Sequence, residues 1–493
     1  MVNDYNFVTP ESEGISSNKI LEFIEFFDEL RINIHSFMIV RHGNIVAEGY
    51  YKPFDKNTRH RLYSCSKSVV SLAVGKLCAE GLVDLNAPLC SYFKDVEKDP
   101  VMAEVTVEDA LKMCVPRKDL YYCKFPMPSD PKAVENADFA KTFFSDEGVA
   151  DKPRGSLFRY NSHASSVLAE LVLRVSGKNF LDYLRPVFDK IGVSPDIECI
   201  KTPFGVDWGA SGVLATTRDF AKIGELVLNK GEYKGKELLP RAYMERATSK
   251  LADTVFGENV NPRCYGYGYQ IWTEPYGFGL HGMRGQVVFC FPDKDIMVVI
   301  NSNEPDFLSK YYYAASRIYK SAADAPLIEN KKSLKKLSDV ISSLKIDRSF
   351  GKAHSALERE ISDKKYVLNE NSMGISEFTL GFNENEGQLR FVMGGEEKTL
   401  SFGCGTYLDT SFPDKSFYGK FLNLKSDREF RTLSTGSWTM ENRLLIMADI
   451  SDDTLGSLGI VFEFSGDTVA LEMRAGGEGI LTDYNGTASG RQE

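Results

Sequence analysis

A run of small residues over positions 61–74 turns apolar directly after Ser64-Cys65-Ser66-Lys67. Because the run then continues for about two turns without a charge, it predicts a buried helix that begins at Ser64. Residues three apart share one face of a helix, so the Lys67 ammonium can reach the Ser64 hydroxyl. A serine becomes a nucleophile when a neighbouring group takes its proton. The run therefore predicts a nucleophile beside a base.

The surroundings of this Ser-x-x-Lys motif distinguish it from its other copies in the chain. The same pattern also begins at Ser16, Ser91, Ser129, Ser333, Ser342, Ser349 and Ser362. Those copies lie in charged, Pro-bearing or Lys-rich stretches, where a lysine stays solvated and protonated. We interpret them as chance matches.

Length and composition indicate a globular chain of more than one domain. The sequence has 493 residues, of which 43% are hydrophobic and 26% are charged, and the length predicts two or three domains. The nine cysteines include no Cys-x-x-Cys pair, which argues against a disulfide framework or a zinc site. With no apolar stretch of spanning length and no signal-like N-terminus, we expect a cytoplasmic protein without a membrane partner. The net charge of −10 argues against a nucleic-acid partner.

The first part of the chain has the pattern of an α+β domain. Strand-like runs at 36–41 and 44–50 flank a His42-Gly43 turn, and two more at 287–291 and 296–300 flank a Pro-Asp turn. Helical patterns lie between these pairs, including one from about 163 to 175 and one over 110–114 that residues 106–109, beginning with Thr106, are predicted to cap. We expect an antiparallel sheet, made from both ends of the domain, flanked by helices and carrying a helical insert. The aromatic, Pro-containing residues 116–157 are interpreted as a lid or loop.

Three regions follow from the changes in composition along the chain. Residues 1–328 are predicted to form the α+β domain. Residues 329–365, which are rich in Lys and Ser with leucines at heptad-like spacing, are predicted to form a helical linker. Residues 366–493 contain strand after strand with short turns, which predicts a C-terminal all-β barrel or sandwich.

Two further motifs follow the first in order, Tyr160-Asn161-Ser162 and His281-Gly282-Met283-Arg284-Gly285. Together with the Ser64 motif they resemble the class C β-lactamase-like serine hydrolase superfamily, which includes penicillin-binding proteins. The resemblance covers roughly residues 10–320, includes the Gly-rich stretch 207–219, and is greatest to the branch of 6-aminohexanoate-dimer hydrolase and related carboxylesterases. The third motif of this superfamily is Lys-Thr-Gly in lactamases and penicillin-binding proteins, and often His-Gly-x-x-Gly in esterase-like members.

The resemblance implies a β-lactamase/transpeptidase-like fold and a set of site residues. It assigns catalysis to Ser64, Lys67 and Tyr160, and substrate binding to Ser162, His281 and Gly282. Chemistry agrees for Tyr160, because a phenol beside a lysine ammonium can carry the serine proton to the leaving group.

Several roles stay open from the residues alone. Lys67 acts as the base, as the electrostatic partner of Tyr160, or as both. Ser162 relays a proton or caps the helix that follows it. His281 polarises or binds the substrate, or only forms a hydrogen bond within a turn. Arg284 is a solvated or structural charge. Tyr160-Asn161-Ser162 also departs from the Tyr-Ser-Asn of many members, which leaves the substrate-binding amide at this motif undetermined.

These observations predict a serine hydrolase that cleaves a small ester or amide through an acyl-enzyme on Ser64, without a metal or a cofactor. The Gly-x-Gly-x-x-Gly match at 277–282 precedes a strand instead of a helix, so a dinucleotide site is not expected. One alternative is a D-amino-acid peptidase, a penicillin-binding activity or a β-lactamase. Another is a non-enzymatic binding protein on the same fold.

Overall fold

The computed structural model describes residues 5–116, 138–145, 148, 155, 157–202, 204–254, 266–304, 308–346, 350–414, 429–452, 455–477 and 479–493. The chain divides into two compact units, Met1–Leu344 and Lys345–Glu493. Most of the predicted lid over 116–157 lies outside the described residues, and within it the structure describes the helix α5, Phe139–Ser145. None of the helices in the described ranges combines the length and the apolar composition needed to cross a membrane.

The first unit is built on an eight-stranded sheet with the strand order β1-β3-β2-β13-β12-β11-β10-β9. The strands are β1 (Asn6–Phe7), β2 (Ile34–Arg41), β3 (Asn44–Tyr50), β9 (Gly266–Tyr267), β10 (Trp272–Glu274), β11 (Gly277–Gly282), β12 (Gln286–Phe291) and β13 (Ile296–Ser302). The two predicted hairpins, β2–β3 and β12–β13, are confirmed as antiparallel pairs, and β13 joins them by pairing with β2. Only β1 departs from the expected antiparallel sheet, because it runs parallel to β3.

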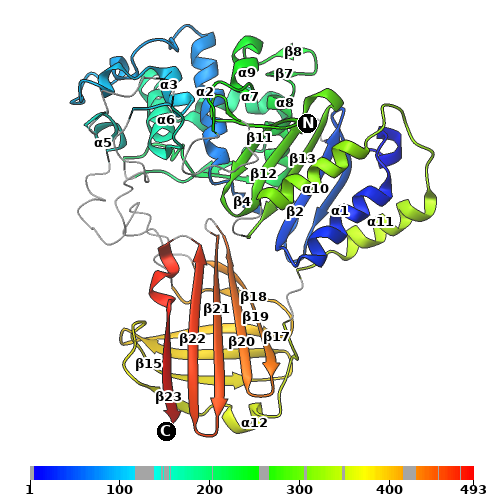
Figure 1. Ribbon diagram of the computed structural model, residues 1–493, viewed down its shortest axis with the longest axis vertical. Helices are drawn as coiled ribbons and strands as arrows, with labels where there is room; N and C mark the ends of the chain where they lie inside the picture. The colour runs from blue at the N-terminus through cyan, green and yellow to red at the C-terminus, as the bar shows by residue number, and fades with distance from the viewer. Residues whose placement is uncertain are drawn as a thin grey trace. The chain divides into compact units, whose positions relative to one another are not determined.

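Helices lie on both faces of this sheet. The helices in the described part of the first unit are α1 (Ser17–Glu29), α2 (Cys65–Ala79), α3 (Val107–Leu111), α5, α6 (Ser162–Ser176), α7 (Phe180–Ile191), α8 (Thr217–Leu228), α9 (Arg241–Ala247), α10 (Leu308–Ser321) and α11 (Lys331–Ser343). Helix α8 packs on β2, β12 and β13, whereas α10 packs on β12 and β13 and against α1. Helices α3, α5 and α6 gather beside α2, apart from α1, α10 and α11 (Figure 1). This group is the predicted helical insert. Two small sheets also belong to the unit: a three-stranded one made of β4 (Arg59–Arg61), β6 (Val213–Thr216) and β5 (Glu198–Cys199), and a two-stranded one made of β7 (Glu232–Tyr233) and β8 (Lys236–Glu237).

The segment predicted as a helical linker, 329–365, contains the division between the two units. Its helix α11 packs against α1 and belongs to the first unit. Two leucines of the heptad-like series are buried, Leu337 within α11 and Leu344 at its C-cap. Lys336 on the same helix contacts Glu25 of α1 at 3.3 Å.

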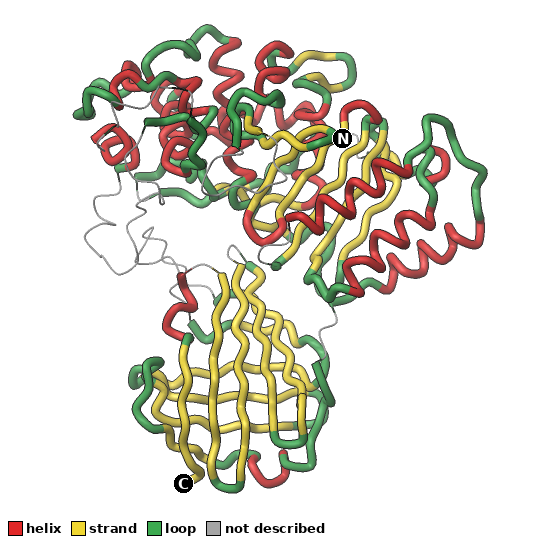
Figure 2. Tube along the Cα trace, in the orientation of Figure 1, coloured by secondary structure: helices red, strands yellow, loops and turns green. Residues whose placement is uncertain are grey.

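The second unit is a closed β-barrel, so of the two predicted alternatives the barrel is the one observed. Its strands are β14 (Lys365–Leu368), β15 (Ile375–Phe382), β16 (Glu386–Met393), β17 (Glu396–Cys404), β18 (Leu408–Ser411), β19 (Arg431–Met440), β20 (Arg443–Ser451), β21 (Leu455–Ser465), β22 (Thr468–Gly477) and β23 (Gly486–Gln492), with the short helix α12 (Glu358–Ile361) before them. A pairing of β17 with β19 closes the sheet. Figure 2 shows the near and far strands crossing each other. Alternate strand residues such as Leu444, Ile446 and Ala448 point inward and fill the barrel.

The predicted buried helix is confirmed as α2. Apart from Lys67 and Lys76 its residues are apolar or small, and such a helix is stable only when neighbours cover it on all sides. Its neighbours are α6, α7, α9 and β11, and its residues include Lys67, which is 1% exposed. Gly81, just beyond the helix, takes the left-handed conformation expected of a C-terminal glycine.

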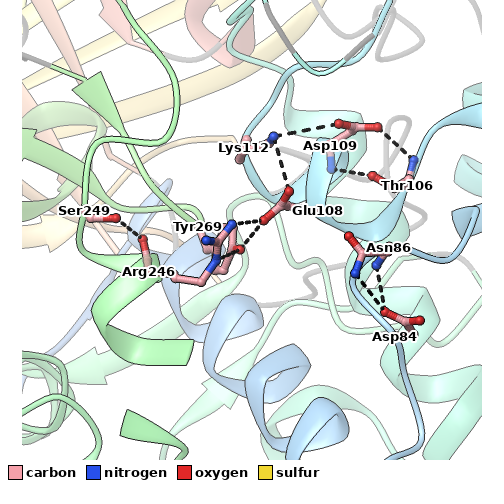
Figure 3. A network of polar contacts seen from close by, with 9 residues as sticks. All are labelled: Asp84, Asn86, Thr106, Glu108, Asp109, Lys112, Arg246, Ser249 and Tyr269. Atoms are coloured by element: carbon pink, nitrogen blue, oxygen red, sulfur yellow. Dashed lines mark hydrogen bonds and ion pairs between the residues drawn. The ribbon is translucent and has the colours of Figure 1, made fainter. Parts of the chain in front are cut away.

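A network of hydrogen bonds and ion pairs connects α3 to α9 and to Tyr269 (Figure 3). Thr106 is the predicted N-cap of α3, and it forms a complete capping box with Asp109. On the same helix Glu108 accepts hydrogen bonds from Arg246 of α9 and from the Tyr269 hydroxyl. Lys112 lies 3.4 Å from the same carboxylate. Partial burial raises the pKa of Glu108, but the hydrogen bonds from Tyr269 and Arg246 and the Lys112 charge outweigh it and lower the pKa below its ordinary value.

Candidate active site

Ser64 lies directly before the first turn of α2 and is half-buried. Its hydroxyl forms no capping hydrogen bond with its own helix, which leaves the oxygen available for other partners. The preceding residue, Tyr63, has φ +48°. A bulky residue in the left-handed region is uncommon and is held there by its surroundings, and such residues cluster at functional sites.

Lys67 reaches Ser64 as its spacing predicts. The Nζ atom donates to Ser64 Oγ at 2.9 Å and to the Ala210 carbonyl at 2.6 Å. Both contacts fix the amine beside the hydroxyl in a place that solvent scarcely reaches. This geometry allows a proton to pass between the two groups, as general-base activation of serine requires.

Arg61 supports the loop that holds Lys67, and sequence reasoning did not identify this role. Its fully buried guanidinium donates from Nε to the Ser211 carbonyl at 2.9 Å and from Nη2 to the Ser211 hydroxyl at 3.0 Å. The guanidinium carbon also lies 4.5 Å from the centre of the Tyr63 ring and 4.8 Å from that of Trp208. Arg61 therefore orients the backbone next to Ala210. The sequence held a signal for this role, because Arg61 is the first residue of the run that contains Ser64, and Ser211 lies in the Gly-rich stretch 207–219.

The structure brings the Tyr160 ring to Lys67. The distance from Lys67 Nζ to the ring centroid is 5.1 Å, within the range of a cation–π contact. Trp272 of β10 stacks on Tyr160 with centroids 5.6 Å apart and planes inclined by 18°. That the Tyr160 hydroxyl lies within hydrogen-bond distance of the Ser64 oxygen remains a prediction.

In the second motif, the residue that caps α6 differs from the one considered in the sequence analysis. Asn161 is the N-cap of α6, because its side-chain oxygen accepts from the backbone N–H groups of His163 and Ala164 at 2.9 and 3.3 Å. Ser162 is the first helical residue and not the cap, so that alternative for Ser162 was wrong. The cap was recoverable from sequence, since Asn is among the preferred N-cap residues.

The third motif places His281 inside the sheet, where it is 8% exposed. Its ring stacks on Trp272 with centroids 5.9 Å apart, and its Nε2 lies 2.9 Å from Glu274 Oε1. The Glu274 side chain is almost fully buried. Glu274 was not predicted from sequence, because a single carboxylate before a turn carries no pattern. A Cβ on Gly279 would lie 2.6 Å from His281 Nε2, so a glycine there makes room for the ring.

Gly282 lets β11 lie against the start of α2. A Cβ at this position would come within 2.3 Å of the Leu62 carbonyl oxygen and 3.2 Å of Cys65 Sγ. The Cys65 thiol donates to the Gln286 carbonyl, 3.2 Å away. Burial raises the pKa of this thiol well above its ordinary value, so it stays protonated beside the nucleophile.

Arg284 is a structural charge and not a solvated one. It is 4% exposed, with φ +59°, and its Nε donates to Asn303 Oδ1 at 2.5 Å. Within the described residues, no three His, Cys, Asp or Glu side chains are grouped closely enough to hold a metal ion. The arrangement as a whole offers a serine, a buried amine and a phenol ring at the junction of α2, α6 and the β10–β11 edge.

Comparisons with known proteins show what this chain is similar to. The family model described as Beta-lactamase matches residues 25–323. The 6-aminohexanoate-dimer hydrolase of Paenarthrobacter ureafaciens is 25% identical over 312 residues, which cover 56% of this chain and 74% of that protein. A solved structure from Bacillus anthracis, named as a candidate 6-aminohexanoate-dimer hydrolase, superimposes with a TM-score of 0.52 at 20% identity, over 65% of this chain and 87% of the other. A family VIII carboxylesterase gives a TM-score of 0.48 at 16% identity, over 65% of this chain and all of the other.

Proposed function

Because the chain belongs to the β-lactamase family, a family of hydrolases, we propose that it is a serine hydrolase that cleaves a small ester or amide through an acyl-enzyme on Ser64. The observation that carries the proposal is the buried Lys67 amine, 2.9 Å from Ser64 Oγ. The Paenarthrobacter relative, named as a hydrolase of the 6-aminohexanoate dimer, supports a small-molecule substrate.

In the proposed reaction Ser64 Oγ bonds to the substrate carbonyl carbon while Lys67 takes the serine proton. Tyr160, whose ring lies against the amine, passes a proton to the departing alcohol or amine as its bond to the carbonyl carbon breaks. Water then hydrolyses the acyl-enzyme and restores the serine. The N-terminus of α2 carries a partial positive charge that favours the developing oxyanion, and Gly282 allows β11 to lie against the same helix start.

The first prediction is that a fluorophosphonate probe labels this protein once, on Ser64, and that Ser64→Ala abolishes both the labelling and hydrolysis of a p-nitrophenyl ester. The variant should unfold like the unaltered protein, because the Ser64 hydroxyl makes no capping bond. Intact mass, peptide mapping and a thermal melt measure these outcomes. Ser342→Ala is the matched control, since Ser342 is exposed and also begins a Ser-x-x-Lys pattern.

Labelling that persists in Ser64→Ala would assign the nucleophile to another residue. A folded, unaltered protein that takes up no probe and hydrolyses no ester would favour the non-enzymatic binding protein on this fold.

A further inference from the structure

Gln270 lies between β9 and β10 in a conformation that its residue type rarely adopts. Its φ is +59° and it is 2% exposed. A residue with a side chain stays in this region only when the surrounding structure holds it there. The residue is outside the three motifs, and sequence reasoning gave it no role.

Both ends of the Gln270 side-chain amide and both of its main-chain groups form hydrogen bonds. Nε2 donates to the carbonyl oxygens of Ala110 and Leu111 in α3, at 3.2 and 2.9 Å, and the backbone N–H donates to Leu111 at 3.1 Å. Oε1 accepts from the Ser165 hydroxyl of α6 at 2.5 Å. The main-chain carbonyl accepts from the Ser68 hydroxyl of α2 at 2.7 Å. One buried residue therefore joins three helices.

Two of these helices carry the proposed chemistry. Ser68 is the residue after Lys67 and lies one turn beyond Ser64 on α2. Ser165 is in the first turn of α6. This helix begins directly after Tyr160 and the N-cap residue Asn161. Trp272, two residues after Gln270, stacks on Tyr160. The bonds to Gln270 thus fix the start of α2 relative to the start of α6.

We propose that Gln270 is a positioning residue, which holds α2 and α6 at the separation that proton transfer among Ser64, Lys67 and Tyr160 requires. This inference rests on the proposed function. Proton transfer needs heavy atoms within hydrogen-bond reach, and a displacement of about 1 Å can lower a rate by about 10²-fold. Loss of one bond to Gln270 leaves the three reacting side chains intact but allows the helices to shift.

The experiment compares variants that each remove part of this junction. Gln270→Glu keeps the shape but cannot donate to the Ala110 and Leu111 carbonyls. Ser165→Ala removes the bond to α6, and Ser68→Ala removes the bond to α2. The matched control is Ser71→Ala, because Ser71 is also buried on α2 and bonds instead to the Tyr243 hydroxyl at 3.0 Å.

We expect the fluorophosphonate labelling rate of Ser64 to fall about tenfold in each serine variant and about 10²-fold in Gln270→Glu. For ester hydrolysis, kcat should fall while KM stays within about twofold, because the interaction serves the reacting groups and not substrate binding. Ser71→Ala should lose thermal stability like Ser68→Ala but keep its labelling rate. If Gln270→Glu does not fold, the two serine variants still decide the outcome.

The positioning role is overturned if Ser68→Ala and Ser165→Ala label as fast as Ser71→Ala, or if KM rises while kcat is unchanged. Both results leave the proposed function standing, because the unaltered protein is labelled in each. Failure of the unaltered protein to label would overturn the proposed function and the positioning role with it.

Discussion

At the scale of single residues, the third motif bears on substrate choice. In the lactamases and penicillin-binding proteins that the sequence resembles, a lysine there provides a fixed positive charge for the substrate carboxylate. Here His281 lies beside the buried Glu274 carboxylate, which offsets any charge that the ring gains. Arg284 is buried and bonded to Asn303. His281 is therefore beside a compensating carboxylate, and the Arg284 side chain is almost fully buried, so neither residue presents an exposed cation to a substrate.

We therefore expect neutral short-chain esters to be hydrolysed with a kcat/KM at least about tenfold above that of a chromogenic cephalosporin, since a charge-assisted hydrogen bond is worth about 1.5–3 kcal/mol. Steady-state kinetics with p-nitrophenyl esters and the cephalosporin near neutral pH measure the ratio. Equal constants would favour a β-lactamase, penicillin-binding or D-amino-acid peptidase activity.

At the scale of elements, α3 depends on both local and tertiary contacts. Its capping box follows from local sequence, and the Glu108 contacts with Arg246 and Tyr269 come from packing. Because α3 also provides the carbonyl oxygens that accept from Gln270, the contacts that hold α3 in place also affect the position of Gln270 beside the candidate active site.

Glu108→Gln should destabilise the first unit at neutral pH and have less effect as the pH falls. The folded pKa of Glu108 is below its ordinary value of 4.5, so the ionised carboxylate stabilises the fold above the unfolded pKa, and this contribution is lost as the pH falls through the folded pKa. Urea unfolding at several pH values measures the difference. Trp438 is the tryptophan of the barrel, so in a Trp438→Phe background the fluorescence of Trp208 and Trp272 reports the first unit.

The control for this experiment is Glu237→Gln, which changes an exposed carboxyl on β8. A Glu108→Gln effect that is the same at pH 7 and pH 4 would show that its contacts act through shape and not through charge.

At the scale of the whole molecule, each unit has its own hydrophobic core. One core draws its residues from positions 38–299 and the other from 361–484. Separate cores are the usual mark of parts that can fold alone. The boundary at Leu344 also keeps α11 with the sheet unit.

A protein of residues 1–344 should therefore unfold in one cooperative transition and still be labelled at Ser64. Calorimetry and the fluorophosphonate probe measure the two outcomes, with the full chain as the reference. Aggregation or the loss of a cooperative transition would show that the sheet unit needs the barrel to fold. A folded fragment with slower labelling would indicate that the barrel contributes to the site.

Much of the fold could be predicted because its signals are local. The apolar run after Ser64 identified α2, the strand-like runs and the turns between them identified the two hairpins, and Thr106 identified the start of α3. These features depend on residues a few positions apart, where helix and strand geometry alone determines which side chains meet. The pairing of Ser64 with Lys67, three residues on, belongs to the same class.

Tertiary structure alone decided the rest of the site. Lys67 binds a carbonyl 143 positions away, Arg61 binds one 150 positions away, and Gln270 joins Ser165 to α3 across more than a hundred residues. Such contacts depend on how helices and strands pack, which no local pattern records. The sequence by itself determined which residues could react, and the packing of α2, α3, α6 and the sheet edge determined what surrounds them, because buried polar groups must find their hydrogen-bond partners wherever the fold brings them.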